Sequence, residues 1–188
     1  MILKRKELKD YLSIELMYKK TLKNILFPPP NYIFVKWLRI YEFFYNNRSN
    51  LFLTPFLLWA YFQYYRYSLK CGLSIPKNVC AKGLTLYHFG SIVINPSCVI
   101  GENCCIMNNV NIGANNGSCA APQIGNNVYI GPGAVIFGDI KIADGCYIGA
   151  NSVVNKNILE PNSVVVGVPA KIIKKDTECW WKKNRLMR

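Results

Sequence analysis

His88 is the only histidine in this 188-residue chain, and its side chain suits proton transfer near neutral pH. A hydroxyl is a poor nucleophile at pH 7, and a neutral imidazole with a pKa of about 6.5 can act as its general base. A single histidine also excludes any metal site built from several histidines. The alternative role for His88 is a local hydrogen bond to a carbonyl group.

The eight cysteines are the other side chains that could act as nucleophiles or ligands. None forms a CxxC pair, and none is next to His88 in the sequence. The first residues, MILKRKELKDYLSIEL, alternate charged and apolar types and show no secretion signal. We therefore expect free thiols in a reducing, cytoplasmic setting, and we find no support for an acyl-enzyme on cysteine.

The elements that must position these residues are indicated by a repeat of six. Aliphatic residues share one phase at Ile94, Ile100, Ile106, Ile112, Ile124, Ile130, Ile136, Ile142, Ile148, Val154, Val166 and Ile172. This period is typical of a parallel β-helix, in which about 18 residues form one triangular coil and the aliphatic side chain points inward. The span 74–172 predicts about five coils, with Gly and Asn at corners that need a positive φ.

Half of the cysteines fall two positions before an aliphatic site, namely Cys80, Cys98, Cys104 and Cys146. The same phase elsewhere holds Val110, Val128, Ala134, Ile140 and Ser152. This is a second inward position that accepts small residues. We therefore predict that these four cysteines fill the core rather than bind metal or react.

Three positions break the aliphatic phase and mark candidate loops. Ser118 lies in GANNGSCAAPQ, so residues 114–123 are predicted to leave the coil, and Glu160 marks a second predicted loop. An imidazole does not fit an aliphatic stack, so the register is expected to break at His88 and turn the ring outward. Loops that leave a rigid scaffold often carry function.

Residues 1–70 contain no hexads and are rich in Tyr, Phe, Leu, Lys and Asn. We expect helices over Met1–Leu26, Ile33–Tyr45 and Phe52–Lys70, with a break at the prolines 28–30. We divide the chain into a helical cap over 1–72, a β-helix over 73–172 and a basic tail over 173–188. The cap is predicted to cover the open end of the β-helix, while sugar stacking or membrane contact is the alternative for its aromatic residues.

The formal net charge of +13 is concentrated at the two ends of the chain. The central hundred residues, 71–170, carry four Lys or Arg and four Asp or Glu, and they show no nucleic-acid-binding motif, so no nucleic-acid partner is expected. The basic ends could meet an anionic cofactor, an acidic polysaccharide or a membrane surface, or simply be solvated. The apolar run Leu51–Phe62 is too short to span a bilayer.

Several segments resemble the hexapeptide-repeat acyltransferases, and more closely the serine acetyltransferase-like branch of capsule and exopolysaccharide O-acetyltransferases. They are GLTLYHFGSIVINPSCVIG (83–101), NVNIGANNG (109–117), VYIGPGAVIFGDIKIADGCYIGANSVV (128–154) and VVGVPAKII (165–173). The resemblance covers about 73–175. It implies a left-handed β-helix, a homotrimer with sites between subunits, and use of acetyl-CoA as co-substrate without a metal.

The resemblance also implies site residues. His88 occupies the family's catalytic-histidine position, as a general base for direct attack of an acceptor hydroxyl on the thioester. Backbone N–H groups of Gly113 or Ala114 are our candidates for stabilising the oxyanion. The CoA arm is expected against Gly113, Ala114, Gly131, Gly149 and Ala150, with Pro169, Lys171 and Lys174 toward the adenine end. Acceptor contacts are expected from Tyr87, Asn108 and Asn111.

The sequence departs from true serine acetyltransferases at two places. They carry an Asp just before the catalytic His and an Arg-His pair in the mid-chain loop, where this chain has Tyr87 and Ala120-Ala121. An amino-acid acceptor would lose its obvious charged partners, so a saccharide hydroxyl of a capsule, O-antigen or exopolysaccharide unit is the predicted acceptor. A lipid-linked unit at the inner membrane face is one form that this acceptor could take. The alternatives are a serine acetyltransferase of cysteine biosynthesis and a non-catalytic β-helix scaffold.

Overall fold

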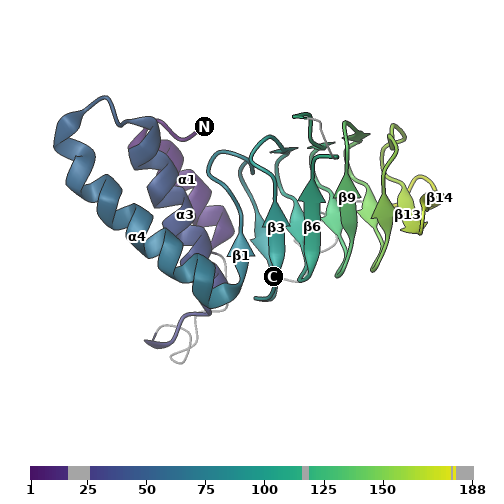
Figure 1. Cartoon of the computed structure of the whole chain (residues 1–188), viewed down its shortest axis with the longest axis horizontal. Helices are drawn as coiled ribbons and strands as arrows, with labels where there is room; N and C mark the ends of the chain where they lie inside the picture. Colours follow the sequence, from purple (N-terminus) through teal and green to yellow (C-terminus); the bar gives the residue numbers. More distant parts are fainter. Residues whose placement is uncertain (17–25, 116–118, 179, 181–188) are drawn as a thin grey trace.

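A computed structural model describes residues 1–16, 26–115, 119–178 and 180 of the chain. Three helices form a cap at one end, and a column of stacked strands extends from it (Figure 1). The strands form three sheets with parallel pairing between successive coils, and this arrangement is a left-handed β-helix with an N-terminal helical part. The predicted fold class is therefore confirmed.

Each sheet is one wall of the column. Sheet 1 consists of β1 (Leu73–Ser74), β3 (Ile92–Ile94), β6 (Val110–Gly113), β9 (Val135–Phe137) and β12 (Val153–Val154). Sheet 2 consists of β4 (Val99–Ile100), β7 (Gln123–Ile124) and β10 (Lys141–Ile142), extended by bridges at Cys80 and Ile158. Sheet 3 consists of β2 (Thr85–Leu86), β5 (Cys105–Ile106), β8 (Tyr129–Ile130), β11 (Tyr147–Ile148), β13 (Val164–Gly167) and β14 (Ala170–Lys174).

The inward positions stack as the hexads predict. Ile94 pairs with Ile112, Ile112 with Ile136 and Ile136 with Val154, and all four side chains are buried. The second inward position is buried as well, and Cys98, Cys104 and Cys146 fill it as predicted. Cys80 is also buried, but it bridges to Ile100 and so takes an aliphatic position of the first coil; its predicted assignment to the second position is wrong. Each wall contains five parallel levels within the described residues, in agreement with the predicted five coils.

The corners use Asn and Gly in the left-handed region, as expected. Asn103, Asn127 and Asn151 have φ values of 55°, 58° and 55°. Asparagine tolerates this conformation better than most residues because its short side chain hydrogen-bonds locally. Asn103 and Asn127 also contact each other between coils, with Nδ2 of Asn103 donating to Oδ1 of Asn127 over 3.3 Å.

Two expectations about the register are wrong toward the end of the column. No loop leaves the coil at Glu160. Ile158 bridges to Ile142 and is buried, so the corner before it, from Val154, spans four positions instead of six, and the corner after it, to Val165, spans seven. The inward residue of the last coil is consequently Val165 rather than Val166. Ile172 does not continue the coil either, because β14 turns back and pairs antiparallel with β13.

Within the described residues, the cap consists of α1 (Arg5–Glu15), α3 (Pro30–Asn46) and α4 (Thr54–Cys71), with a 3-10 turn η1 (Leu51–Leu53) before α4. Pro30 and Pro55 lie in the first turns of α3 and α4, where a missing N–H costs nothing, and Gly72 ends α4 with φ 68°. The predicted helix over Met1–Leu26 is too long: α1 begins at Arg5 and ends at Glu15, and residues 17–25 lie outside the described residues.

The cap covers the first coil, as predicted. Phe34, Val35 and Leu38 of α3 are buried in the same core cluster as the β-helix interior. Two side chains of α4 donate to β-helix carbonyls, Tyr64 Oη to Ile75 and Ser68 Oγ to Leu73. Within the described residues, no helix is both long enough and apolar enough to cross a membrane.

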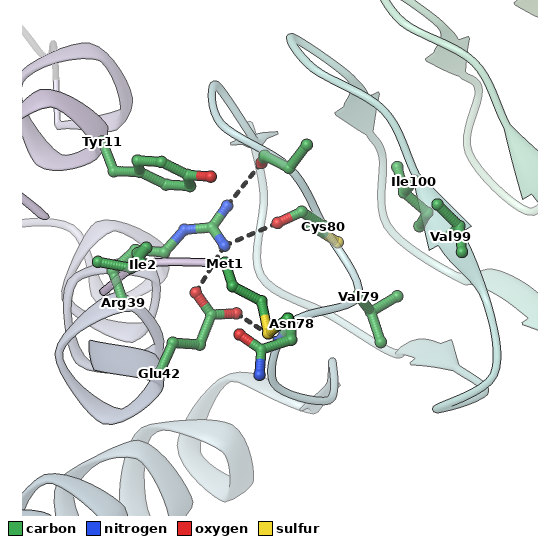
Figure 2. A pocket seen from close by; sticks show the side chains of 11 residues that line it. Met1, Ile2, Tyr11, Arg39, Glu42, Asn78, Val79, Cys80, Val99 and Ile100 are labelled. Carbon is green, nitrogen blue, oxygen red and sulfur yellow. Dashed lines mark hydrogen bonds and ion pairs between the residues drawn. The ribbon is translucent and has the colours of Figure 1, made fainter. Parts of the chain in front are cut away.

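A buried charge cluster fastens the cap to the first coil (Figure 2). Arg39 of α3 is fully buried and forms ion pairs of 2.8 Å with Glu15 and Glu42. Its remaining bonds go to the carbonyl oxygens of Cys80 and Ala81, so all five guanidinium N–H groups have acceptors. The carboxylates in turn accept backbone N–H groups of the coil, from Asn78 to Glu42 and from Gly83 and Leu84 to Glu15.

Candidate active site

His88 lies in an enlarged corner of the first coil. Leu86 pairs with Ile106 and Ile94 pairs with Ile112, so eight positions separate the inward residues in the first coil and six in the second. The two additional residues let the chain bulge between β2 and β3 while the aliphatic stack continues on both sides. His88 is therefore exposed rather than part of the stack, as its side-chain type predicted.

This corner is anchored on both sides although it protrudes. The N–H of Gly90 donates to the carbonyl of Cys71, the last residue of α4, over 2.9 Å. Gly90 has φ 140°, and a Cβ built there would lie 3.2 Å from Cβ of Asn108 in the next coil. Glycine is required here for its conformation and for the close approach of the two coils. Asn31 of α3 fixes the start of the corner by donating to the Leu86 carbonyl.

The imidazole is open to solvent and available for a ligand. Tyr87 and Phe89 on either side are 38% and 63% exposed. In the part of the chain that the structure describes, no hydrogen bond or ion pair involves the His88 side chain. No carboxylate orients this ring as an Asp at position 87 would.

The corners stacked below His88 form one edge of the column, where the chain passes from sheet 3 to sheet 1. We call this the His88 edge; it comprises residues 87–91, 107–109, 131–134 and 149–152. It brings together Tyr87, Asn108, Gly131, Gly149 and Ala150, five of the residues predicted for acceptor and CoA. The turn between β13 and β14, with Pro169, lies at the same edge because Gly149 approaches Val166 and Gly167 donates to Ser152.

Glycine lets two corners of the His88 edge stack closely. A Cβ on Gly131 would lie 2.8 Å from the backbone nitrogen of Ala150, so only glycine allows these two corners to stack so closely. Lys171 pairs with Val166 near the tip of the hairpin, whereas Lys174 pairs with Val164 at its far end. Both lysines are exposed, and an elongated ligand along this edge could reach Lys171 first.

Gly113 and Ala114 do not share this edge. Gly113 ends β6 and Ala114 follows it, at the opposite side of sheet 1, where the chain passes to sheet 2; we call this the loop edge because residues 114–115 and 119–122 lie there. Asn111 lies between the two edges, exposed on β6. A four-residue strand thus separates the predicted oxyanion donors from the His88 edge, about 13 Å along one chain.

The predicted loop is present at the loop edge. Ile100 pairs with Ile124, 24 positions later, so this coil holds six residues more than the usual 18. Residues 116–118, including Ser118, lie outside the described residues. Ala121 is buried in the core cluster, so its side chain closes the loop onto the coil and does not face an acceptor.

Four of the buried thiols are poor nucleophiles in this fold. Burial raises the pKa of Cys98 to about 11 and also raises the pKa of Cys80, Cys71 and Cys146. A thiol that holds its proton at neutral pH neither attacks a thioester nor binds a metal readily. Within the described ranges, no cluster of three or more His, Cys, Asp or Glu side chains could hold a metal ion.

One neighbour of the site was missed by sequence reasoning. Phe89 is exposed beside His88 and belongs to the same bulge. The spacing of eight between Leu86 and Ile94 was the available signal, because it shows that the whole segment 87–91 leaves the stack.

The comparisons with a family model and with curated proteins agree with each other. A model described as bacterial transferase hexapeptide (six repeats) matches residues 121–156. The serine acetyltransferase of Buchnera aphidicola subsp. Schizaphis graminum is 43% identical over 103 residues, which cover 53% of this chain and 39% of that protein. The matched part of the chain is therefore similar to hexapeptide-repeat transferases and, among named relatives, to serine acetyltransferases.

Solved structures agree with this family. The Neisseria gonorrhoeae serine acetyltransferase in complex with serine has a TM-score of 0.68 and 25% identity, over 90% of this chain and 70% of that chain. The Brucella abortus serine acetyltransferase in complex with coenzyme A has a TM-score of 0.71 and 23% identity, over 93% and 70%, and at that identity supports the fold alone.

The match to the family is partial in length and in subtype. The chain spans less than half of the Buchnera relative. None of the relatives described here is named for a capsule or exopolysaccharide enzyme, so that finer subtype remains a prediction.

Proposed function

We propose that this protein is an O-acetyltransferase that moves an acetyl group from acetyl-CoA to a hydroxyl, with His88 as general base. The observation that carries the proposal is the corner itself. The chain's only histidine is extruded from a rigid coil, exposed to solvent and free of hydrogen bonds to the described residues. This is a suitable place for a base whose partner is a substrate.

The proposed reaction is a direct transfer. The His88 imidazole takes the proton of the acceptor hydroxyl as its oxygen attacks the thioester carbonyl carbon. The carbon–sulfur bond then breaks, the CoA thiolate leaves and takes up a proton, and the acetyl ester remains on the acceptor. No cysteine is needed, in agreement with the raised pKa values of the buried thiols.

The proposed CoA site runs along the His88 edge. From the His88 corner to the β13–β14 turn the column descends four levels, about 19 Å at the spacing of paired strands. Gly131, Gly149 and Ala150 present little side-chain bulk along this path, and Pro169 and Lys171 lie at its end. Lys171 and Lys174 would meet the anionic phosphates.

The proposed oxyanion donors require a second copy of the chain. Gly113 and Ala114 lie at the loop edge, across sheet 1 from His88, so one protomer cannot place them at its own thioester. A homotrimer, in which the loop edge of one protomer faces the His88 edge of the next, would combine them. This arrangement is part of the proposal, together with acceptor contacts from Tyr87, Asn108 and Asn111.

The comparisons favour L-serine as the acceptor. The relatives described above are named serine acetyltransferases, and one solved structure contains serine. A saccharide hydroxyl is the second candidate, and specific residues favour it: Tyr87 replaces an Asp beside the base, and neither Ala120 nor the buried Ala121 carries a charge that could pair with the carboxylate or ammonium of an amino acid.

The experiment is thiol release from acetyl-CoA with wild type, His88→Ala and, as control, Ser91→Ala at an exposed residue of the same corner. L-Serine, free sugars and capsule oligosaccharides are offered in turn. We expect acceptor-dependent thiol release that falls about 10²–10⁴-fold in His88→Ala and is retained in Ser91→Ala.

Each outcome is informative. Turnover of L-serine establishes a serine acetyltransferase, and turnover of a saccharide alone establishes the second candidate. Calorimetry with acetyl-CoA separates an untested acceptor from a protein that does not bind the donor. Absence of acetyl-CoA binding, or full activity of His88→Ala, would contradict the proposed function and favour a scaffold.

A further inference from the structure

We propose that the outer face of α4 is a docking surface for an anionic lipid membrane, on which the helix lies parallel to the bilayer plane. This inference does not rest on the proposed catalytic function. In Figure 1, α4 forms one flank of the cap, and α1 and α3 lie on its other side. Its inner side packs on α3 through the buried Ala60, and none of the described elements covers its outer side.

The outer face of α4 is apolar along its whole length. Leu58, Phe62, Tyr65 and Leu69 recur at spacings of four, three and four, which places them on one side of the helix. All are at least half exposed, from 52% for Phe62 to 67% for Leu69. Trp59 extends this stripe and stacks on Phe62 at 5.8 Å. Contiguous exposed apolar surface of this kind indicates a binding site.

The charged residues near the stripe indicate which kind of partner it binds. Arg66 and Lys70 are exposed on α4. No Asp or Glu occurs between Glu42 and Glu102, while five Lys or Arg do. Trp and Tyr favour the boundary between lipid headgroups and acyl chains, and basic side chains attract anionic headgroups. An apolar aromatic stripe on a helix that carries Arg66 and Lys70 and no acidic residue therefore complements an anionic membrane.

The same charge argues against a second copy as the partner. A two-fold contact brings two copies of the same patch together, so the Arg66 and Lys70 of both copies would be crowded into one interface. The α4 sequence offers no acidic residue to neutralise them. Crossing of the membrane is not implied, because no described helix is long and apolar enough for it.

The experiment is co-sedimentation of the full chain with vesicles of phosphatidylcholine alone or mixed with phosphatidylglycerol, at low and high salt. Phe62→Glu tests the stripe, and Leu159→Glu, at a residue 68% exposed on the β-helix, is its matched control. Arg66→Gln/Lys70→Gln tests the charge against Lys141→Gln/Lys156→Gln. Circular dichroism and thermal unfolding check that each variant folds.

We expect binding to the anionic vesicles that weakens with salt. Phe62→Glu should abolish it, and Arg66→Gln/Lys70→Gln should lower the partition coefficient about fivefold per charge, while both controls bind like wild type. Binding no stronger than to phosphatidylcholine, or equal loss in test and control variants, would overturn the proposal. So would a fall in hydrodynamic mass in Phe62→Glu, which would identify a second copy as the occupant. The proposed O-acetyltransferase function is tested separately, by measuring acetylation of a soluble acceptor. The two tests are independent because the stripe does not include His88.

Discussion

The junction between cap and β-helix and the His88 edge both contain side chains capable of chemistry, but the two regions hold them in opposite states. Arg39 at the junction is fully buried, and each of its N–H groups donates to an acceptor of the protein. His88 is exposed, and its side chain forms no hydrogen bond or ion pair with the described residues. Buried charges must be paired to be tolerated, whereas an exposed and unpaired base can take its partner from a substrate.

This difference in pairing distinguishes side chains that hold the fold together from side chains that are available to a substrate. The pocket at the junction is lined by Arg39 and Glu42, yet their polar atoms are already used by neighbours (Figure 2). Burial alone would lower the pKa of Arg39, but the charges of Glu15 and Glu42 raise it well above its ordinary value. We therefore interpret the Arg39 cluster as a clamp for the cap and not as a ligand site.

The largest expected effect is loss of this clamp. Arg39→Met should lower the free energy of unfolding by about 3–5 kcal/mol, because Glu15 and Glu42 would remain buried without their cation. Denaturant unfolding measures this, with Arg48→Met as control, since Arg48 at the surface stacks on Tyr45 and donates to the Tyr45 carbonyl but pairs with no buried carboxylate. A variant that stays as stable as wild type but loses thiol release would contradict the comparison, because Arg39 would then belong to the functional chemistry.

A smaller effect is expected from Gly90→Ala, which acts on the His88 edge. Its φ of 140° and the nearby Cβ of Asn108 should cost about 1–3 kcal/mol and displace the corner. Displacement of a base by about 1 Å can lower the rate about 10²-fold. Thermal unfolding and thiol release together measure the two effects.

The matched control for Gly90→Ala is Gly145→Ala. Gly145 has φ 71°, and a Cβ built there would meet Oδ1 of Asn162, but Gly145 lies between β10 and β11, away from both the His88 edge and the loop edge. It should lose stability with little loss of rate. Equal rate losses in the two variants would mean that general destabilisation, and not the position of His88, limits activity.

The repeating part of the fold was predictable from the sequence because one physical rule repeats. Each inward position must be aliphatic or small, and each corner must allow a positive φ, so Ile112, Cys104 and Asn127 could be assigned by counting. Counting failed where corners change length. The stack needs an aliphatic side chain at each level and not a fixed spacing, so Ile158 could take the position expected two residues later.

The residues of the candidate site could be chosen from the sequence, but the edge of the column on which each of them lies could not be predicted. Gly113 and Gly131 are 18 positions apart, which in a regular column would stack them at one edge. The loop between them adds six residues and moves Gly113 to the next edge. The Arg39 clamp could not be predicted either, since it joins α1, α3 and the first coil through residues that share no sequence pattern.

The smallest expected effect tests whether the cysteines at the inward positions are core residues. Burial raises the pKa of Cys98 from 9.0 to about 11, so the folded state keeps the proton in a range where the unfolded chain loses it. The stability that Cys98 contributes should be fully present below pH 9 and lost as the pH rises toward 11. Denaturant unfolding at about pH 8 and about pH 10 measures the decline.

The free energy of unfolding of Cys98→Ala should decline less, and that of Cys119→Ala, at an exposed thiol, should decline like that of wild type. An equal decline in all three proteins would mean that the Cys98 thiol is as accessible to solvent in the folded chain as in the unfolded one, and the exposed–buried contrast between His88 and the thiols would lose its basis.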